Sequence, residues 1–404
     1  LHKGSTNAEL ESMVAEVDTG NRIPKAFYAA VILMVVPLAW SLFQLWTGSP
    51  LPSQFGIGFL NDTQSRAIHL AFALFLTYLA FPAFKGSPRS HIPITDWILA
   101  FGSAFCAAYI YIFYEDLSLR PGLPTTMDLV VSGIGITLVL EAARRSLGPP
   151  LMIVALVFLA YIFFGNSPYL PDILQWRGAS FSKTMSHMWL STEGVFGIAL
   201  GVSSGFVFLF VLFGALLNSA GAGEYFIKVA FSLLGHMRGG PAKAAVLSSA
   251  MTGMISGSSI ANTVTTGTFT IPLMKRVGFS AEKAGAIEVS SSVNGVIMPP
   301  VMGAVAFLMV EYVGIPYIEV VKHAFLPATI SYIALLYIVH LEALKMNMQG
   351  LPRTSPAQPI KARLLRSGIV ISSMLMLLGA IYFIVEGIKE YFSLLSAPLV
   401  IALI

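Results

Sequence analysis

Apolar runs of about 20 residues recur along this chain, and they limit what it can fold into. A helix of roughly 20 mostly apolar residues crosses the hydrocarbon core of a bilayer. Hydrophobic residues make up 56% of the chain and charged residues 11%, whereas a soluble domain carries about 25% charged residues. A transmembrane β-barrel would show short alternating segments instead. The sequence therefore predicts an all-α polytopic membrane protein.

The predicted spans follow one another closely. They are 27–46, 66–84, 94–113, 127–143, 149–165, 194–217, 281–313, 317–343 and 367–385, and another begins near residue 394. Basic residues gather on the cytoplasmic side of membrane helices. Arg22 and Lys25 precede the first span, and Arg144 and Arg145 follow the fourth. This pattern predicts a cytoplasmic N-terminus.

Segment 240–276 is crowded with Ser, Thr, Gly and Asn, yet it lies among apolar spans. Both of its ends are basic, so we expect Lys243 and Lys275 to lie on the same, cytoplasmic face. Each arm, 240–256 and 259–274, is short for a full crossing. The pattern predicts a re-entrant helical hairpin that turns at 256–259. A mostly apolar stretch before it, 222–236, is expected to lie in the cytoplasmic interface.

Span 281–313 is long enough to cross but is interrupted. A run rich in Ser, Asn and Gly, 290–295, precedes Pro299 and Pro300. Proline cannot donate to a helical ladder and favours the first turn of a new helix. We expect two half-helices with an unwound middle at 290–300. Two discontinuous segments that face each other can form a binding site at the bilayer midplane.

At such breaks, free carbonyls suit a small cation and free N–H groups suit an anionic substrate. The same residues also fit purely structural roles. Gly253 and Gly257 form a small-xxx-small pair that is typical of close helix packing, and the prolines can mark a simple kink. Thr263, Thr266 and Thr270 share one helical face, where their hydroxyls line a path or bond back to their own helix.

Glu288 is the ionisable residue of the broken span that most suggests a role. A charge at membrane depth is costly and is usually functional. Glu288 is expected to carry a proton, to pair with Lys283 or Lys275, or to be solvated near the surface. In contrast, Glu141 with Arg144 and Arg145 is expected to form a surface pair at a helix end.

Catalytic and cofactor-binding patterns are absent from the sequence. Gly239-Gly240-Pro241-Ala242-Lys243 lacks the spacing of a phosphate-binding loop, so the chain offers no support for ATP-driven transport. The histidines show no metal-ligand spacing, and the lone Cys106 cannot form an intrachain disulfide. We therefore expect no enzyme activity, no cofactor and no metal beyond a coupling cation.

Several of these stretches together resemble the fused permeases of TRAP (tripartite ATP-independent periplasmic) transporters, in particular the TAXI-associated type. They are 239–243, Gly257-Ser258-Ser259 with Ala261-Asn262, 266–275 and Pro299-Pro300-Val301-Met302-Gly303. The resemblance is specific over 239–303 and weaker elsewhere. It implies the first half of an inverted-repeat elevator transporter in the bacterial inner membrane, with the second repeat lying beyond Ile404.

The resemblance also implies a division of the chain. Residues 1–25 would be a cytoplasmic segment, 26–147 a scaffold like the small subunit, and 148–238 the scaffold and interfacial helices of the large subunit. Residues 239–313 would form the hairpin and broken helix of the transport domain, and 314–404 further membrane helices.

By position, the resemblance implies the site residues as well. The ion ligands would be Ser258, Ser259, Asn262, Ser291, Ser292, Asn294 and Gly295. The substrate contacts would be Ser256, Gly257, Ala261, Thr263, Pro299 and Pro300. Glu288 would be the site of H⁺, should H⁺ replace Na⁺ as the coupling ion.

The function implied is uptake of a small organic acid, coupled to Na⁺ or H⁺ and supplied by a periplasmic TAXI-type binding protein. Other functions stay open on the sequence. One is a carrier of organic anions that works without a binding protein. Another is a channel, in which the hairpin is a static pore element. An intramembrane enzyme is the least favoured, because paired catalytic groups are missing.

Overall fold

The computed structural model describes Arg22, residues 26–84, 86–299 and 302–350, and seven single helical positions within 372–387. Within those residues every regular element is a helix, as predicted. Five of these helices are long and apolar enough to cross a membrane. They are Phe27–Thr47, Ile94–Ile112, Thr126–Leu147, Ile198–Ser219 and Tyr317–Lys345. The predicted span 367–385 and the one from 394 lie outside the continuously described residues.

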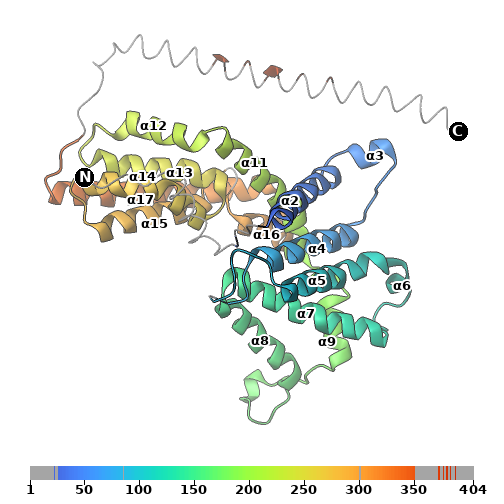
Figure 1. The fold of residues 1–404 in the computed structure, drawn as a ribbon. Coiled ribbons are helices and arrows are strands. Elements are labelled where there is room, and N and C mark those ends of the chain that lie inside the picture. The colour runs from blue at the N-terminus through green and yellow to red at the C-terminus, as the bar shows by residue number, and fades with distance from the viewer. Residues whose placement is uncertain are drawn as a thin grey trace.

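The first half of the chain forms one helical group, drawn in blue to green in Figure 1. Its main helices are α2 (Phe27–Thr47), α4 (Asp62–Ala80), α5 (Ile94–Ile112), α7 (Thr126–Leu147) and α8 (Pro149–Phe164). Short helices connect them: α3 (Leu51–Phe55), α6 (Tyr114–Leu119), a 3-10 turn (Asp172–Leu174) and α9 (Phe181–Trp189). These short helices lie outside the predicted spans because they carry no long apolar run.

Local capping sets where α4 begins. Asn61 accepts a hydrogen bond from the backbone N–H of Gln64, and the Gln64 side chain accepts one from the N–H of Asn61. This reciprocal capping box satisfies two N–H groups that a helix start leaves free. The helix consequently starts at Asp62, four residues before the predicted span at 66. It also ends at Ala80, before the predicted end at 84.

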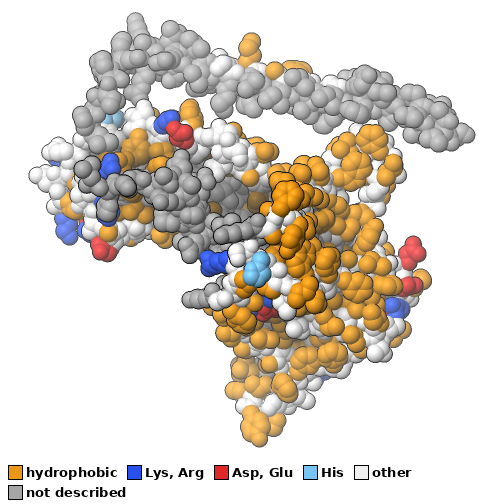
Figure 2. Space-filling model, in the orientation of Figure 1, with side chains coloured by type: hydrophobic (Ala, Val, Ile, Leu, Met, Phe, Trp, Pro, Cys, Tyr) orange, Lys and Arg blue, Asp and Glu red, His pale blue; other side chains and the backbone are white. Residues whose placement is uncertain are grey.

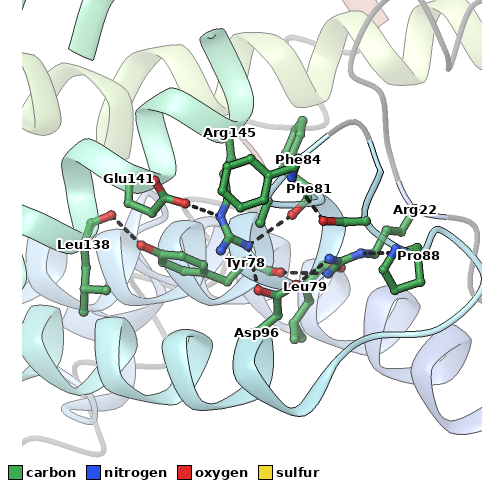
Figure 3. A network of polar contacts seen from close by, with 12 residues as sticks. Arg22, Tyr78, Leu79, Phe81, Phe84, Pro88, Asp96, Leu138, Glu141 and Arg145 are labelled. Atoms are coloured by element: carbon green, nitrogen blue, oxygen red, sulfur yellow. Dashed lines mark hydrogen bonds and ion pairs between the residues drawn. The ribbon is translucent and has the colours of Figure 1, made fainter. Parts of the chain in front are cut away.

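A buried ionic network ties the ends of α4, α5 and α7 together (Figure 3). Asp96 on α5 accepts from Arg22 and, at 2.9 Å, from Arg145 on α7, while Arg145 also contacts Glu141 at 2.8 Å. The side chain of Arg145 is 3% exposed, and its guanidinium stacks over the ring of Tyr78. The expectation of a surface pair here was wrong for Arg145. Tyr78 on α4 covers its guanidinium, and Asp96 on α5 is its second acidic partner.

The second half forms the other group, drawn in yellow-green to orange in Figure 1. It begins with α10 (Ile198–Val202), a π-helical turn (Ser203–Val207) and α11 (Phe208–Ser219), which together form the predicted span, at 198–219 where 194–217 was expected. Then follow α12 (Ala222–Leu234), α13 (Gly240–Ser256), α14 (Ser259–Arg276), α15 (Ala281–Val296), α16 (Ala304–Val313) and α17 (Tyr317–Lys345). Small residues dominate α13, and most of its residues are buried. It is the central helix of this group, packed between α12, α14 and α15.

Polar contacts at the π-helical turn join the two groups. His69 on α4 receives the indole N–H of Trp40 at its Nδ1, 3.1 Å away, and its Nε2 lies 3.3 Å from Ser203 Oγ. Because Trp40 donates to Nδ1, the ring carries its proton on Nε2 and donates to Ser203. Two backbone carbonyls before α10, those of Phe196 and Gly197, also accept from Arg66 on α4.

Apolar side chains cover much of the surface of the first group (Figure 2). Leu38, Ile98, Phe101 and Val130, for example, are 49% to 65% exposed. A soluble protein rarely exposes a broad apolar surface, whereas lipid favours one. The fold is therefore that of a multi-pass membrane protein, as predicted.

Candidate functional site

The predicted hairpin is present as two helices joined by a very short turn. The first arm, α13, ends at Ser256, and Gly257 then adopts a left-handed conformation with φ 61°. Ser258 caps α14 by accepting a hydrogen bond from the N–H of Ala261 at 3.2 Å. Only Gly257 and Ser258 are non-helical, so the turn is shorter than the predicted 256–259. Whether the hairpin re-enters the membrane from one face stays a prediction.

The interruption of span 281–313 is also present, but it lies further along the chain than expected. The first half-helix, α15, continues to Val296, and α16 starts at Ala304. Residues 290–295, expected to be unwound, are helical because nothing before Pro299 removes a backbone N–H donor. Within the turn, Met302 has φ 57°, a left-handed conformation that non-glycine residues seldom adopt. Pro300, an expected substrate contact, lies outside the described residues.

The two interruptions meet in space. A Cβ added to Gly257 would lie 2.9 Å from the carbonyl oxygen of Met302, and one added to Gly253 would lie 2.7 Å from the Cα of Gly295. Distances this short leave no room for side chains, so glycine is required for the approach. The end of α13, the turn of the hairpin and the break after α15 thus lie backbone to backbone. The sequence predicted this meeting from two separate patterns.

Behind the turn, a chain of polar side chains crosses three helices. Asn262 on α14 is fully buried and donates through Nδ2 to the carbonyl of Ser249 at 2.8 Å and to its Oγ at 3.1 Å. Ser249 Oγ on α13 lies 3.0 Å from Ser292 Oγ on α15. Ser249 was missed by the sequence analysis. The signal available was its spacing four residues before Gly253, which puts both on one helical face.

Glu288 occupies the centre of the interface between α14 and α15 and is fully buried. Thr270 lies 2.6 Å from one carboxyl oxygen, Thr266 contacts the other, and Ser292 lies 3.4 Å from that same oxygen. Lys283, an expected partner, pairs with Glu342 instead, and Lys275 is exposed. Hydroxyl groups thus take the place of a cation as the partners of this carboxyl group. Solvation at the surface, another expectation, is excluded by the burial.

The threonines combine both roles considered for them. Thr263, Thr266 and Thr270 each place their hydroxyl 2.8–3.0 Å from the carbonyl four residues earlier. Thr266 and Thr270 additionally contact Glu288. Thr263 has only the helical bond and is half-buried. The shared face therefore binds α15 rather than lining an open path.

The remaining predicted residues differ in exposure. Ser291, Ser292, Gly295 and Pro299 are buried, while Ser258 is exposed. The others are half-buried: Ser256, Gly257, Ser259, Ala261, Thr263 and Asn294. Tyr332 on α17, which the sequence analysis missed, donates to the carbonyl of Ser291 at 2.7 Å. Across the described ranges, no three His, Cys, Asp or Glu residues come together as metal ligands.

A cavity of about 210 Å³ opens beside the hairpin. Its walls come from α11, the start of α12 and the two arms of the hairpin, and Ser256, Ala261 and Asn262 contribute to them. Three of the expected site residues therefore line one open cavity. At this cavity the hairpin lies beside α11, a helix that the sequence assigned to the scaffold.

Comparison with known proteins identifies the family. The family model of the tripartite ATP-independent periplasmic transporter, DctM component, matches residues 134–403, which is more than half of the chain. Similar curated proteins include the C4-dicarboxylate TRAP transporter large permease protein DctM of Pseudomonas aeruginosa, 28% identical over 177 residues (43% of this chain, 40% of the relative). Another is the sialic acid TRAP transporter large permease protein SiaM of Vibrio cholerae, 28% identical over 153 residues (38% and 35%). A third is the sialic acid TRAP transporter permease protein SiaT of Haemophilus influenzae, 26% identical over 175 residues (43% and 28%). The chain spans less than half the length of each of these relatives.

Proposed function

Because this chain belongs to the DctM component family of tripartite ATP-independent periplasmic transporters, we propose that it takes up a small organic acid by secondary active transport. In this proposal a periplasmic binding protein of the TAXI type delivers the acid. The permease lies in the bacterial inner membrane with its N-terminus in the cytoplasm. Residues 26–147 act as a fused small subunit that braces the scaffold. A C4-dicarboxylate permease among the relatives supports an acidic substrate.

One observation supports this function above the others: the turn of the hairpin contacts the break after α15. Gly257 approaches the Met302 carbonyl, and Gly253 approaches Gly295. Interrupted helices that face each other at membrane depth place free carbonyls and free N–H groups in one spot. A lipid-facing break would leave these groups unsatisfied, so such a break is tolerated where it is buried in protein or lines a cavity. An elevator movement would carry α13–α16 with the bound solutes.

We propose Na⁺ as the coupling ion, held by oxygen atoms at this meeting point. The candidate ligands are Ser258, Ser259, Asn262, Ser291, Ser292, Asn294 and Gly295. The substrate contacts proposed beside them are Ser256, Gly257, Ala261, Thr263, Pro299 and Pro300. H⁺ is the second candidate, favoured by the buried Glu288, which has hydroxyl partners and forms no ion pair within the described part of the chain.

Transport by the full chain in proteoliposomes tests the proposal. Radiolabelled succinate serves as the probe, with and without a TAXI-type binding protein and with an imposed Na⁺ or pH gradient. We expect uptake to require the binding protein and the Na⁺ gradient. Ser259→Leu should abolish it, whereas Ser290→Leu, on the exposed side of α15, should not. Uptake that follows the pH gradient and disappears in Glu288→Gln would assign H⁺ instead.

Two results would contradict the proposal. The first is a conductance that persists without any gradient coupling, which would indicate a channel. The second is uptake by Ser259→Leu equal to that of the wild type, which would show that transport does not depend on the turn of the hairpin.

A further inference from the structure

The cavity beside the hairpin is lined mostly by apolar surface and by no charged side chain. Val211 and Ala215 supply apolar surface from α11, Phe226 supplies it from α12 and Ile255 from α13. Its volume is about 210 Å³. One water needs only roughly 10–15 Å³, but it also needs about two to four polar partners, and apolar cavities stay dry. A space of this size and lining therefore favours an apolar occupant.

The polar groups in the walls are already hydrogen-bonded within the hairpin. The hydroxyls of Thr252, Ser256 and Thr265 each donate to a backbone carbonyl, at 2.8–3.3 Å. Asn262 is fully buried, and its amide group donates to Ser249. A charged group that leaves water must be paired with an opposite charge and hydrogen-bonded. Because the walls contain no charged side chain, the cavity does not suit a carboxylate.

The mouth of the cavity lies on an exposed face of α11. Val211, Ala215 and Asn218 line the cavity and are exposed, and their spacing puts them on one face of this helix. The helix belongs to the apolar span Ile198–Ser219, in which Val211 is 59% and Phe213 is 51% exposed. The apolar surface that this span presents to lipid therefore continues into the cavity.

We propose that this cavity binds one hydrocarbon chain of a bilayer lipid, which enters from the side of α11. Lipid tails are as apolar as leucine side chains, so a tail that enters loses little and gains dispersion contacts with the walls. The chain lies between α11, α12 and the two arms of the hairpin. None of the described residues of the break after α15 belongs to the walls. The lipid chain therefore leaves the place where the two interruptions meet free for a transported solute.

Photo-cross-linking of the full chain in nanodiscs tests the proposal. The probe is phosphatidylcholine that carries a diazirine near the end of one acyl chain, and labelled residues are mapped by mass spectrometry. We expect label on Ile255 and on Thr252, which is only 8% exposed and lines the cavity. Excess succinate should not reduce this label, since the walls offer a carboxylate no opposite charge.

Two variants fill the cavity from different walls. Ala215→Phe adds a ring from α11 and Ala222→Phe adds one from α12. We expect both to lower the labelling of Ile255 several-fold. Phe158 on α8, which is 63% exposed, meets lipid away from the cavity, so its labelling should stay constant. The matched control is Ala160→Phe, on the exposed side of α8, which should leave the labelling of Ile255 unchanged.

Three results would overturn the proposal. The first is a wild-type chain that is labelled at Phe158 but at neither Thr252 nor Ile255. The second is labelling of Ile255 that is equal in the wild type and in both cavity-filling variants. The third is loss of this label when succinate is added, which would assign the cavity to the transported acid.

Discussion

Gly253 on α13 and Gly295 on α15 lie backbone against backbone, so that a Cβ on Gly253 would come within 2.7 Å of the Gly295 Cα. This contact lies next to the place where the turn of the hairpin meets the break after α15. Membrane helices use small residues for such approaches because close backbones gain van der Waals contact. Gly253 and Gly257, four residues apart at the end of α13, were expected either to pack helices closely or to belong to a site. The contact of Gly253 with Gly295 shows that Gly253 packs against α15.

Gly253→Leu tests this contact. The added side chain has no room against α15, and overpacking of a close contact destabilises by about 1–3 kcal/mol. We expect a lower melting temperature in detergent and a loss of transport. The matched control is Gly285→Ala, because a Cβ on Gly285, in the same helix as Gly295, meets nothing within 4 Å. Alanine there should be neutral or stabilising, by up to about 1 kcal/mol. Equal melting temperatures for Gly253→Leu and the wild type would contradict the contact.

The turn itself can be tested with a pair of glycines. Gly257 and Gly221 both have left-handed φ angles, of 61° and 86°. Alanine is strained at either, by about 1–2 kcal/mol. Only at Gly257 would the methyl group also approach a backbone oxygen, that of Met302. We therefore expect Gly257→Ala to lower the melting temperature more than Gly221→Ala. A larger decrease in melting temperature for Gly221→Ala than for Gly257→Ala would contradict the contact between the turn and the break.

Thr270→Val removes one hydroxyl partner of Glu288 with little change in volume. Since the carboxyl group is fully buried, an unmet hydrogen bond there should destabilise the protein by about 1–3 kcal/mol. Thr268→Val is the control, because Thr268 bonds only to the carbonyl of Thr265 in its own helix. Thermal unfolding of both variants provides the measurement. A smaller effect at Thr270 than at Thr268 would argue against the buried contact.

Asp96→Ala should disrupt the ionic network of the first group. Its removal leaves Arg22 and Arg145 buried without this carboxylate, and breaking a buried ion pair typically destabilises by about 3–5 kcal/mol. Glu319→Ala is the comparison, because Glu319 forms an exposed pair with Lys322. Exposed pairs contribute about 0–1 kcal/mol. The two melting temperatures should therefore differ clearly. Similar values would mean that water reaches the network.

The hairpin predicts a topology that labelling can check. In a Cys106→Ser background, single cysteines replace Arg238 and Lys275, which lie at the outer ends of α13 and α14 and are exposed. Because the two arms turn back at Gly257, both cysteines should react with an impermeant thiol reagent from the same side of the membrane. Reaction from opposite sides would replace the hairpin with a crossing helix. Glu319 replaced by cysteine gives a reference site in another helix.

The helices of this protein follow from short-range features that are visible in the sequence. Apolar length predicted α2, α5, α7 and α17 closely, because crossing a bilayer requires about 20 apolar residues. Polar and glycine-rich residues predicted the hairpin, and prolines predicted a break before α16. Boundaries were less accurate where a cap decided them, as at Asn61, or where serines stayed helical, as in 290–295.

By itself, the sequence determined that the chain is a membrane protein with two chain interruptions, since the lengths and polarity of single segments are enough for both. Only the tertiary structure decided which side chains meet. It placed Ser249 beside Ser292, covered Arg145 with α4 and α5, and gave Glu288 hydroxyl partners in place of lysine. Such pairings join residues that lie far apart along the chain, and their formation depends on how helices rotate and cross. A local sequence pattern does not determine how the helices rotate about their axes, because this rotation depends on the packing of small residues such as Gly253 and Gly295 against each other.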